Sequence, residues 1–134
     1  MNSSKQRRVL FVCVHNSGRS QMAEAFVNAL SDGKIIAESA GTIPVGTLNP
    51  TAVEAMREKG ISMTGQHPKV MTQDMVDRAD KVITMGCALD EACPAVFVPS
   101  EDWCLDDPKD RALAEVRRIR DEIEANVKGL LEEL

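Results

Sequence analysis

Residues 9–14 read Val-Leu-Phe-Val-Cys-Val, and His15-Asn16-Ser17-Gly18-Arg19-Ser20 follows directly. The first run is apolar and rich in valine, which is typical of a strand buried on both faces of a parallel sheet. The next four residues are turn formers. Apolar residues then recur at helical spacing between Met22 and Leu30. This stretch therefore predicts a buried strand, a tight loop and a helix.

The rest of the chain repeats the alternation. Further strands are expected at 34–37, 81–85 and 95–98, and helices at 50–60, at 72–80 and from Pro108 onward. The last helix carries a core-facing stripe made of Leu113, Val116, Ile119, Ile123, Val127 and Leu130. Alternating strands and helices predict an α/β fold with helices on both faces of a parallel sheet. Ligands of such sheets bind beyond the carboxyl ends of the strands, where Cys13, Cys87 and the loop after Val98 would converge.

Length and composition set the class of protein. A chain of 134 residues fits one domain, 1–134, with residues 1–7 as a disordered lead-in. The net charge of −5 argues against a nucleic-acid partner, so any anion site must be local. The apolar run 9–14 is too short for a signal peptide or a membrane span, so we expect a cytoplasmic protein with no membrane partner. In a reducing compartment, the four cysteines favour catalytic or redox use over structural disulfides.

The loop after the first strand carries the chemistry. Backbone N–H groups of Val14, His15, Asn16, Ser17 and Gly18, together with the start of a helix, form a concavity that binds phosphate-like anions. Arg19 adds a planar fork for two anion oxygens. The same positive field favours the thiolate of Cys13, and the hydroxyl of Ser20 can hydrogen-bond it. The alternative is a buried structural cysteine beside a solvated arginine, which the strand–loop–helix setting disfavours.

The stretch from Val9 to Ala25 resembles the active-site loop of arsenate reductases with the low-molecular-weight tyrosine phosphatase fold. The resemblance extends over nearly the whole chain, because Ser39-Ala-Gly41, Asn49-Pro50, Thr84-Met-Gly-Cys87 and Asp106-Asp-Pro108 fall in the family's order. It implies a four-stranded parallel sheet flanked by helices and an oxidoreductase that reduces arsenate, as in arsenical resistance. It also implies that Cys13 is the nucleophile, Arg19 the oxyanion clamp, Ser20 the thiolate's partner and Asn16 the residue that shapes the loop.

The resemblance also gives roles to two other cysteines. Cys87 and Cys93 would be the second and third thiols of a relay that ends in a redox-active disulfide, reduced by thioredoxin or a similar dithiol. Many thioredoxin-coupled members have six residues between these cysteines, whereas this chain has five. Cys104 is expected to be a bystander. The cysteine spacing does not fit zinc, and we expect neither a bound metal nor a cofactor.

Asp107-Pro108 matches the family's Asp-Pro, which implies that Asp107 is the general acid. The neighbouring Asp106 competes for that role, and Asp107 is also a candidate N-cap of the last helix.

Some members of the family bind potassium near the loop. Asn16, Glu24 and Ser39 match part of that site, but Lys69 replaces an acidic ligand and His67 a threonine, so the Lys69 ammonium would supply the charge; the alternative is a solvated lysine.

Two other functions remain open. A phosphatase acting on phosphotyrosine or small phosphate esters would use the same loop and acid without the further cysteines. Trp103 and three phenylalanines are the only aromatic side chains of the Phe, Trp and Tyr types, so few rings are available to sandwich a phenyl group. A phosphocarrier or anion-binding module would leave the Asp-Pro and the extra cysteines unexplained. We therefore expect arsenate as substrate, with phosphate or sulfate as competing anions.

Overall fold

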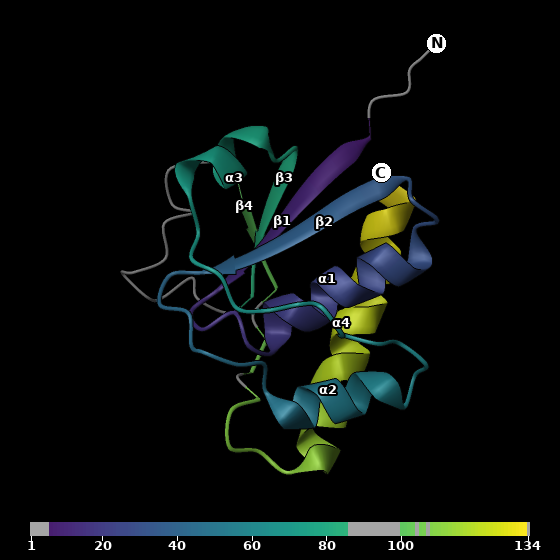
Figure 1. Ribbon diagram of the computed structural model, residues 1–134. Coiled ribbons are helices and arrows are strands. Elements are labelled where there is room, and N and C mark those ends of the chain that lie inside the picture. Colours follow the sequence, from purple (N-terminus) through teal and green to yellow (C-terminus); the bar gives the residue numbers. More distant parts are fainter. Residues whose placement is uncertain (1–5, 86–99, 104, 107, 134) are drawn as a thin grey trace.

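The computed structural model describes residues 6–85, 100–103, 105–106 and 108–133. Its strands are β1 (Arg7–Cys13), β2 (Ile35–Gly41), β3 (Lys81–Thr84) and β4 (Ser100–Asp102), which form one parallel sheet in the order β2-β1-β3-β4. The helices are α1 (Arg19–Leu30), α2 (Pro50–Arg57), α3 (Gln73–Arg78) and α4 (Leu113–Glu133) (Figure 1). The expected four-stranded parallel α/β fold is thereby confirmed.

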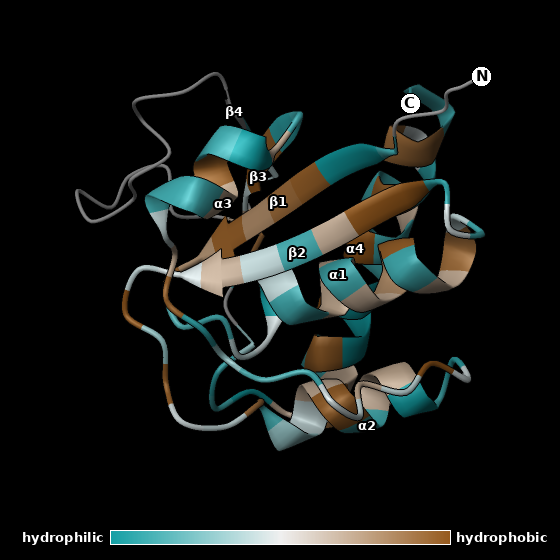
Figure 2. Cartoon of the chain, turned by 45° about the horizontal axis from the view of Figure 1, so that its top comes forward, coloured by the Kyte–Doolittle hydropathy of each residue, from teal (hydrophilic) through white to brown (hydrophobic). Residues whose placement is uncertain are grey.

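Strand β1 is central and is covered on both faces. Val9, Phe11 and Cys13 belong to a core cluster that also contains buried residues of α1, α2 and α4. Leu10 and Val12 face the other way and pack in a smaller cluster with residues of α3. This two-sided burial explains why the strand is a continuous apolar run, visible as the brown length of β1 in Figure 2.

The strand bounds differ in part from those expected. Strand β1 begins at Arg7, which pairs with Ile35, so the strand starts inside the predicted lead-in. Strand β2 extends to Gly41 rather than stopping at residue 37, and the register of β1 with β2 continues as far as Cys13 and Gly41. The strand expected at 95–98 lies outside the described residues. On the side away from β1, β3 pairs with β4, where Val82 lies opposite Ser100.

The predicted start of the last helix near Pro108 is wrong, because α4 begins at Leu113. Asp110 has a φ of 59°, which is left-handed and interrupts a right-handed helix. The N–H of Arg111 donates to the Pro108 carbonyl (3.2 Å), which closes a turn ahead of the helix. The helix itself begins with bonds from the Glu115 and Val116 N–H groups to the Ala112 carbonyl. The alternative of Asp107 as N-cap of α4 therefore does not hold.

Helix α4 is amphipathic along its whole length. Its buried residues are Val116, Ile119, Arg120, Ile123, Val127 and Leu130, which largely repeat the predicted stripe. Leu113, the first residue of that stripe, is only partly buried. Within the described ranges, no helix has the length and apolar character needed to cross a membrane.

A charged cluster joins α4 to the end of α2. The guanidinium of Arg120, with its side chain 9% exposed, donates from Nη1 to the Ala55 carbonyl and to Glu58 Oε1, both at 2.9 Å. Arg117 donates to both oxygens of Glu58, at 2.9 and 2.6 Å. These hydrogen bonds lower the pKa of Glu58 from 4.5 to about 2, and the bond from Arg117 has the largest effect.

This cluster predicts a pH-dependent contribution to stability. A folded-state pKa below the unfolded value stabilises the fold above pH 4.5, and the contribution disappears as the pH falls towards about 2. Glu58→Gln should therefore lower the melting temperature near neutral pH, and the difference from the parent should shrink on acidification. Thermal unfolding followed by circular dichroism measures this, with Glu132→Gln, an exposed residue of α4, as the control. A difference that stays constant across the acid range contradicts the assignment.

Candidate active site

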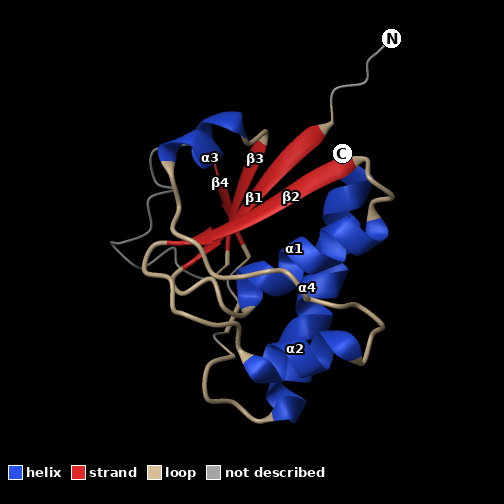
Figure 3. Cartoon of the chain, in the orientation of Figure 1, coloured by secondary structure: helices blue, strands red, loops and turns tan. Residues whose placement is uncertain are grey.

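The loop between β1 and α1 is held from outside by the segment after β2. The N–H groups of Thr42, Ile43, Val45 and Asn49 donate to the carbonyls of Cys13, Val14, His15 and Ser17, at 3.2, 2.8, 3.2 and 2.8 Å. Figure 3 shows the two loops side by side at the carboxyl end of the sheet. In a trans peptide, the carbonyl of one residue and the N–H of the next point in opposite directions. The N–H groups of residues 14, 15, 16 and 18 therefore point away from that segment, which is the arrangement of an anion-binding nest.

Asn16 shapes the turn at the centre of this loop. It is fully buried and has a φ of 52°, a left-handed conformation that asparagine tolerates better than most residues. Its Nδ2 donates to Ser20 Oγ (2.7 Å), and its Oδ1 accepts from the backbone N–H of Lys69 (2.9 Å). Asn16 therefore connects the turn to Ser20 on one side and to the segment at Lys69 on the other.

The sulfur of Cys13 lies inside the loop, with its residue 2% exposed. Ser20 Oγ is 2.8 Å away, and the Asn16 N–H donates to the sulfur at 3.2 Å. Because Asn16 also donates to Ser20 Oγ, the hydroxyl hydrogen of Ser20 is directed towards the sulfur. The sulfur of Cys13 therefore has two hydrogen-bond donors beside it, one from a side chain and one from the backbone.

Arg19 is buried at the start of α1 and connects the loop to the ends of two strands. Its Nη1 donates to the carbonyl of Met85 (2.7 Å), just after β3, and to that of Leu105 (3.1 Å), beyond β4. These bonds position the guanidinium at the carboxyl ends of the sheet, where the N–H groups of the loop also lie. A guanidinium is planar and suits two oxygens of a tetrahedral anion at once.

Two close approaches limit which residues fit around the loop. A Cβ on Gly41 would lie 2.6 Å from the carbonyl oxygen of Val14 and 3.0 Å from the Asn16 Cβ. A Cβ on Gly18 would lie 2.7 Å from Cγ of Pro108. Pro108 therefore packs on the loop at Gly18.

Asp106 pairs with Arg118 rather than with the Cys13 loop. Its Oδ2 lies 2.9 Å from Arg118 Nη2 on α4. The hydrogen bond from Arg118, helped by the positive charges of Arg118, Arg111 and Arg19, lowers the pKa of Asp106 below its ordinary value. Asp106 is therefore ionised near neutral pH and carries no proton to donate.

The structure brings together Cys13, Val14, His15, Asn16, Ser17, Gly18, Arg19 and Ser20 as the sequence predicted. Cys87, Cys93, Cys104 and Asp107 lie outside the described residues. In the part of the chain that is described, no three His, Cys, Asp or Glu side chains are grouped to hold a metal ion.

The sequence reading did not identify Gln21 and Gln66. Gln21 Nε2 lies within 3.0 Å of three oxygens, namely Asn16 O, Asn16 Oδ1 and His67 O. Gln66 Nε2 donates to Gln21 Oε1 (2.7 Å). A glutamine on the buried side of the predicted helix, among apolar neighbours, is the signal in the sequence that could have identified Gln21.

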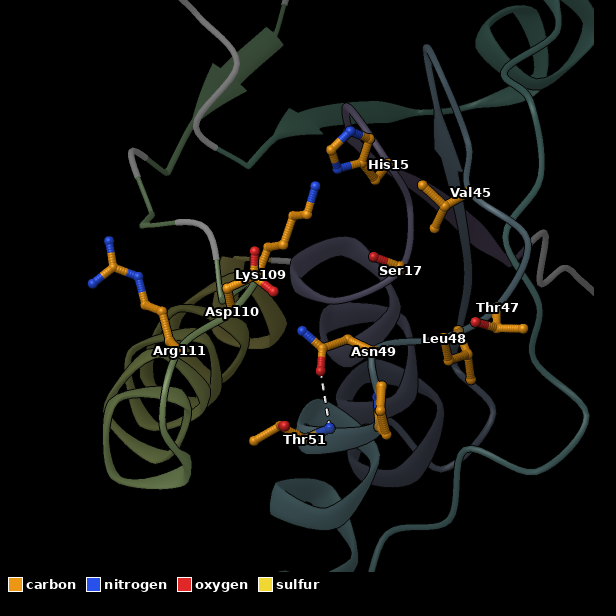
Figure 4. Close-up of a pocket in the computed structure, with 11 residues that line it drawn as sticks. His15, Ser17, Val45, Thr47, Leu48, Asn49, Thr51, Lys109, Asp110 and Arg111 are labelled. Atoms are coloured by element: carbon orange, nitrogen blue, oxygen red, sulfur yellow. Dashed lines mark hydrogen bonds between the residues drawn. The ribbon is translucent and has the colours of Figure 1, made fainter.

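A pocket of about 300 Å³ opens beside the loop (Figure 4). His15 and Ser17 form one wall, Val45 to Thr51 another, and residues 109–111 a third. The lining contains no phenylalanine, tyrosine or tryptophan side chain among the described residues. The pocket is thus lined by charged groups of both signs, by hydroxyls and an amide, and by small apolar side chains.

The chain is similar to known proteins of one family. The profile of the low molecular weight phosphotyrosine protein phosphatase family matches residues 8–134. The chain belongs to this family. Among its relatives is an arsenate reductase of Brevibacillus brevis, 36% identical over 129 residues, which cover 95% of this chain and 96% of that protein.

Two solved structures similar to this chain are especially informative. An arsenate reductase in a phosphate-binding state superimposes with a TM-score of 0.83 at 35% identity, covering 96% of this chain and 98% of that one. A thioredoxin-dependent arsenate reductase of Corynebacterium glutamicum superimposes with a TM-score of 0.81 at 32% identity, covering 98% of this chain and 63% of that one.

The contact at Gly41 predicts that this residue is needed for anion binding. Gly41→Ala should raise the Kd for phosphate by about tenfold or more, since overpacking against backbone costs on the order of 1–3 kcal/mol. Isothermal titration calorimetry measures the affinity. Gly46→Ala is the control, because a Cβ there meets nothing within 4 Å. Equal phosphate affinity in both variants would show that the close approach does not shape the loop.

Proposed function

We propose that this protein reduces arsenate to arsenite, with Cys13 as the nucleophile. The observation that carries the proposal is the Cys13 sulfur inside an anion-binding loop, with Ser20 Oγ at 2.8 Å and the Asn16 N–H at 3.2 Å. The arsenate reductases among the relatives support the choice of oxyanion. Phosphate and sulfate have the same tetrahedral shape and compete for the loop.

In the proposed first step, the loop N–H groups and Arg19 hold the arsenate oxygens. The Cys13 thiolate attacks the arsenic, a sulfur–arsenic bond forms, and one oxygen leaves as water. A hydroxide is a poor leaving group, so the step needs a proton donor, and we assign Asp107 to that role. The packing of Pro108 on Gly18 supports the assignment, as does the ionised state of Asp106.

The proposed second step transfers two electrons. The Cys87 thiolate attacks the Cys13 sulfur, the sulfur–arsenic bond breaks, and its electron pair stays on arsenic, which leaves as arsenite. The product is a Cys13–Cys87 disulfide. Cys93 then attacks Cys87, which frees Cys13 and leaves a Cys87–Cys93 disulfide. Thioredoxin or a similar dithiol reduces that bond, as the thioredoxin-dependent relative suggests. The relay requires reduced thiols, so the cytoplasm is the compartment we expect.

The phosphatase alternative is disfavoured by the pocket beside the loop. A phenyl ring is best held by aromatic neighbours, and the described lining of this pocket has none. A phosphocarrier would need the same loop but would not use further thiols. Product analysis separates the three functions, since they yield arsenite, free phosphate or a stable phosphocysteine.

The acid assignment makes a prediction for two neighbouring aspartates. Asp107→Asn should slow arsenite formation by about 10²–10⁴-fold, the usual contribution of general acid catalysis. Asp106→Asn should have a small effect near neutral pH, because its carboxylate is already ionised beside Arg118. Initial rates of arsenite release measure both. A larger loss in Asp106→Asn than in Asp107→Asn contradicts the assignment.

The surroundings of Lys69 predict independence from potassium. Its Nζ lies 3.7 Å from Glu24 Oε1, and that same oxygen accepts from Ser39 Oγ (2.6 Å). The ammonium thus stands beside the carboxylate that a potassium ion would need, and these residues do not fit a bound cation. Initial rates in sodium and in potassium buffer of equal ionic strength should agree within about twofold. Strong activation by potassium would leave Lys69 as a surface residue only.

The relay predicts distinct products from cysteine variants after one turnover without reductant. Cys13→Ser should release no arsenite, because a serine hydroxyl is not ionised near neutral pH. Cys93→Ser should release arsenite once and retain a Cys13–Cys87 disulfide. Cys104→Ser should behave as the parent. Peptide mass mapping identifies the bridge, and a Cys13–Cys104 disulfide in the Cys93→Ser protein would overturn the order of thiols.

A further inference from the structure

Gln21 is a polar side chain in a place that normally selects apolar residues. It lies in the first turns of α1 and is fully buried between Met22, Ala23 and the other core residues of that helix. A buried amide is stable only when its donors and its oxygen are hydrogen-bonded. All of its partners belong to the Cys13 loop or to the segment around Gln66, so the residue joins these two parts of the chain.

The hydrogen bonds determine which way the amide faces. Gln66 Nε2 lies 3.1 Å from the backbone carbonyl of Gln21, so this Gln66 atom must be the donor nitrogen. The Gln21 atom 2.7 Å from it must then be the oxygen, Oε1. The Nε2 of Gln21 consequently faces Asn16 and the carbonyl of His67, which are acceptors.

Gln21 holds Asn16 at two points. Its Nε2 is 3.0 Å from the backbone oxygen of Asn16 and 3.0 Å from the side-chain oxygen. A left-handed backbone at a residue other than glycine is strained and persists only where its surroundings hold it. In this loop the same conformation directs the Asn16 N–H to Cys13 Sγ and the Asn16 Nδ2 to Ser20 Oγ.

We propose that Gln21 is a positioning residue for the nucleophile: its buried amide holds Asn16 in the conformation that provides the hydrogen bonds to Cys13 and Ser20. Gln21 acts through Asn16, since the side chain of Gln21 hydrogen-bonds to Asn16, His67 and Gln66 and not to Cys13 or Ser20 directly. Gln66 supports it from the far side by fixing the direction of the amide. The proposal rests on the proposed function only in that the Cys13 thiolate is the group that reacts.

Alkylation of Cys13 by iodoacetamide tests the proposal without arsenate, so it separates this proposal from the proposed function. Trypsin releases residues 9–19 as one peptide, whose only cysteine is Cys13, and mass spectrometry follows its modification in the full chain. Gln21→Met keeps the length of the side chain but removes its amide. Alkylation of this variant should slow about fivefold or more near pH 6 and approach the parental rate near pH 10, because only the thiolate reacts.

Arg120→Met is the matched control. It also replaces a buried hydrogen-bonded side chain by methionine, but its bonds to Ala55 and Glu58 lie between α2 and α4. Its alkylation profile should follow that of the parent within about twofold. Gln66→Met, which keeps the amide of Gln21, should shift the profile in the same direction by a smaller amount, and it carries the test if Gln21→Met does not fold by circular dichroism. An unchanged pH profile of alkylation in Gln21→Met overturns the proposal. If Gln21→Met does not fold, an unchanged profile in Gln66→Met overturns it instead. A slowing that is equal at every pH does so too.

Discussion

The site depends on the hydrogen bonds that turn the carbonyls of the Cys13 loop outward. Four backbone N–H groups of residues 42–49 donate hydrogen bonds to the carbonyls of Cys13, Val14, His15 and Ser17. The N–H groups of the loop are thereby directed inward, where they create a local positive potential. A chain with a net charge of −5 repels anions overall, so a local positive potential of this kind is needed for an oxyanion to bind. Gly41 allows the two segments to approach because it has no side chain.

The sheet determines how the rest of the site is attached to this loop. Parallel pairing places the ends of β1, β2 and β3 at one edge. Arg19 bridges that edge by donating to carbonyls just after β3 and beyond β4. The segments that continue from these carbonyls carry the remaining predicted groups, Cys87 and Cys93 after β3 and Asp107 after β4. Arg19, the residue directly after the anion loop, therefore contacts the two segments from which, in our proposal, a thiol and a proton are delivered.

Local patterns predicted the parts of the structure that local forces determine. The apolar run of β1, the turn residues after it and the helical spacing beyond Met22 were sufficient for the strand, the loop and α1. The sequence did not reveal the hydrogen bonds of Gln21 to Gln66 and His67, because these partners lie about 45 residues further along the chain. The start of α4 was misplaced because proline at residue 108 also suits a turn, and the left-handed Asp110 ends that turn. The lowered pKa of Asp106 depends on Arg118, twelve residues away on α4, so the Asp-Asp-Pro motif by itself could not predict it.

The central claim is that one chain reduces one arsenate with its own thiols. Its most direct test is a stoichiometry measured on the fully reduced protein, mixed with excess arsenate and no external reductant. Arsenite is quantified by separation of the two arsenic species, and free thiols are counted after denaturation in a matched sample. The account predicts one arsenite formed and two of the four thiols lost per chain, with no thiol lost when phosphate replaces arsenate. Retention of all four thiols with no arsenite formed would contradict it.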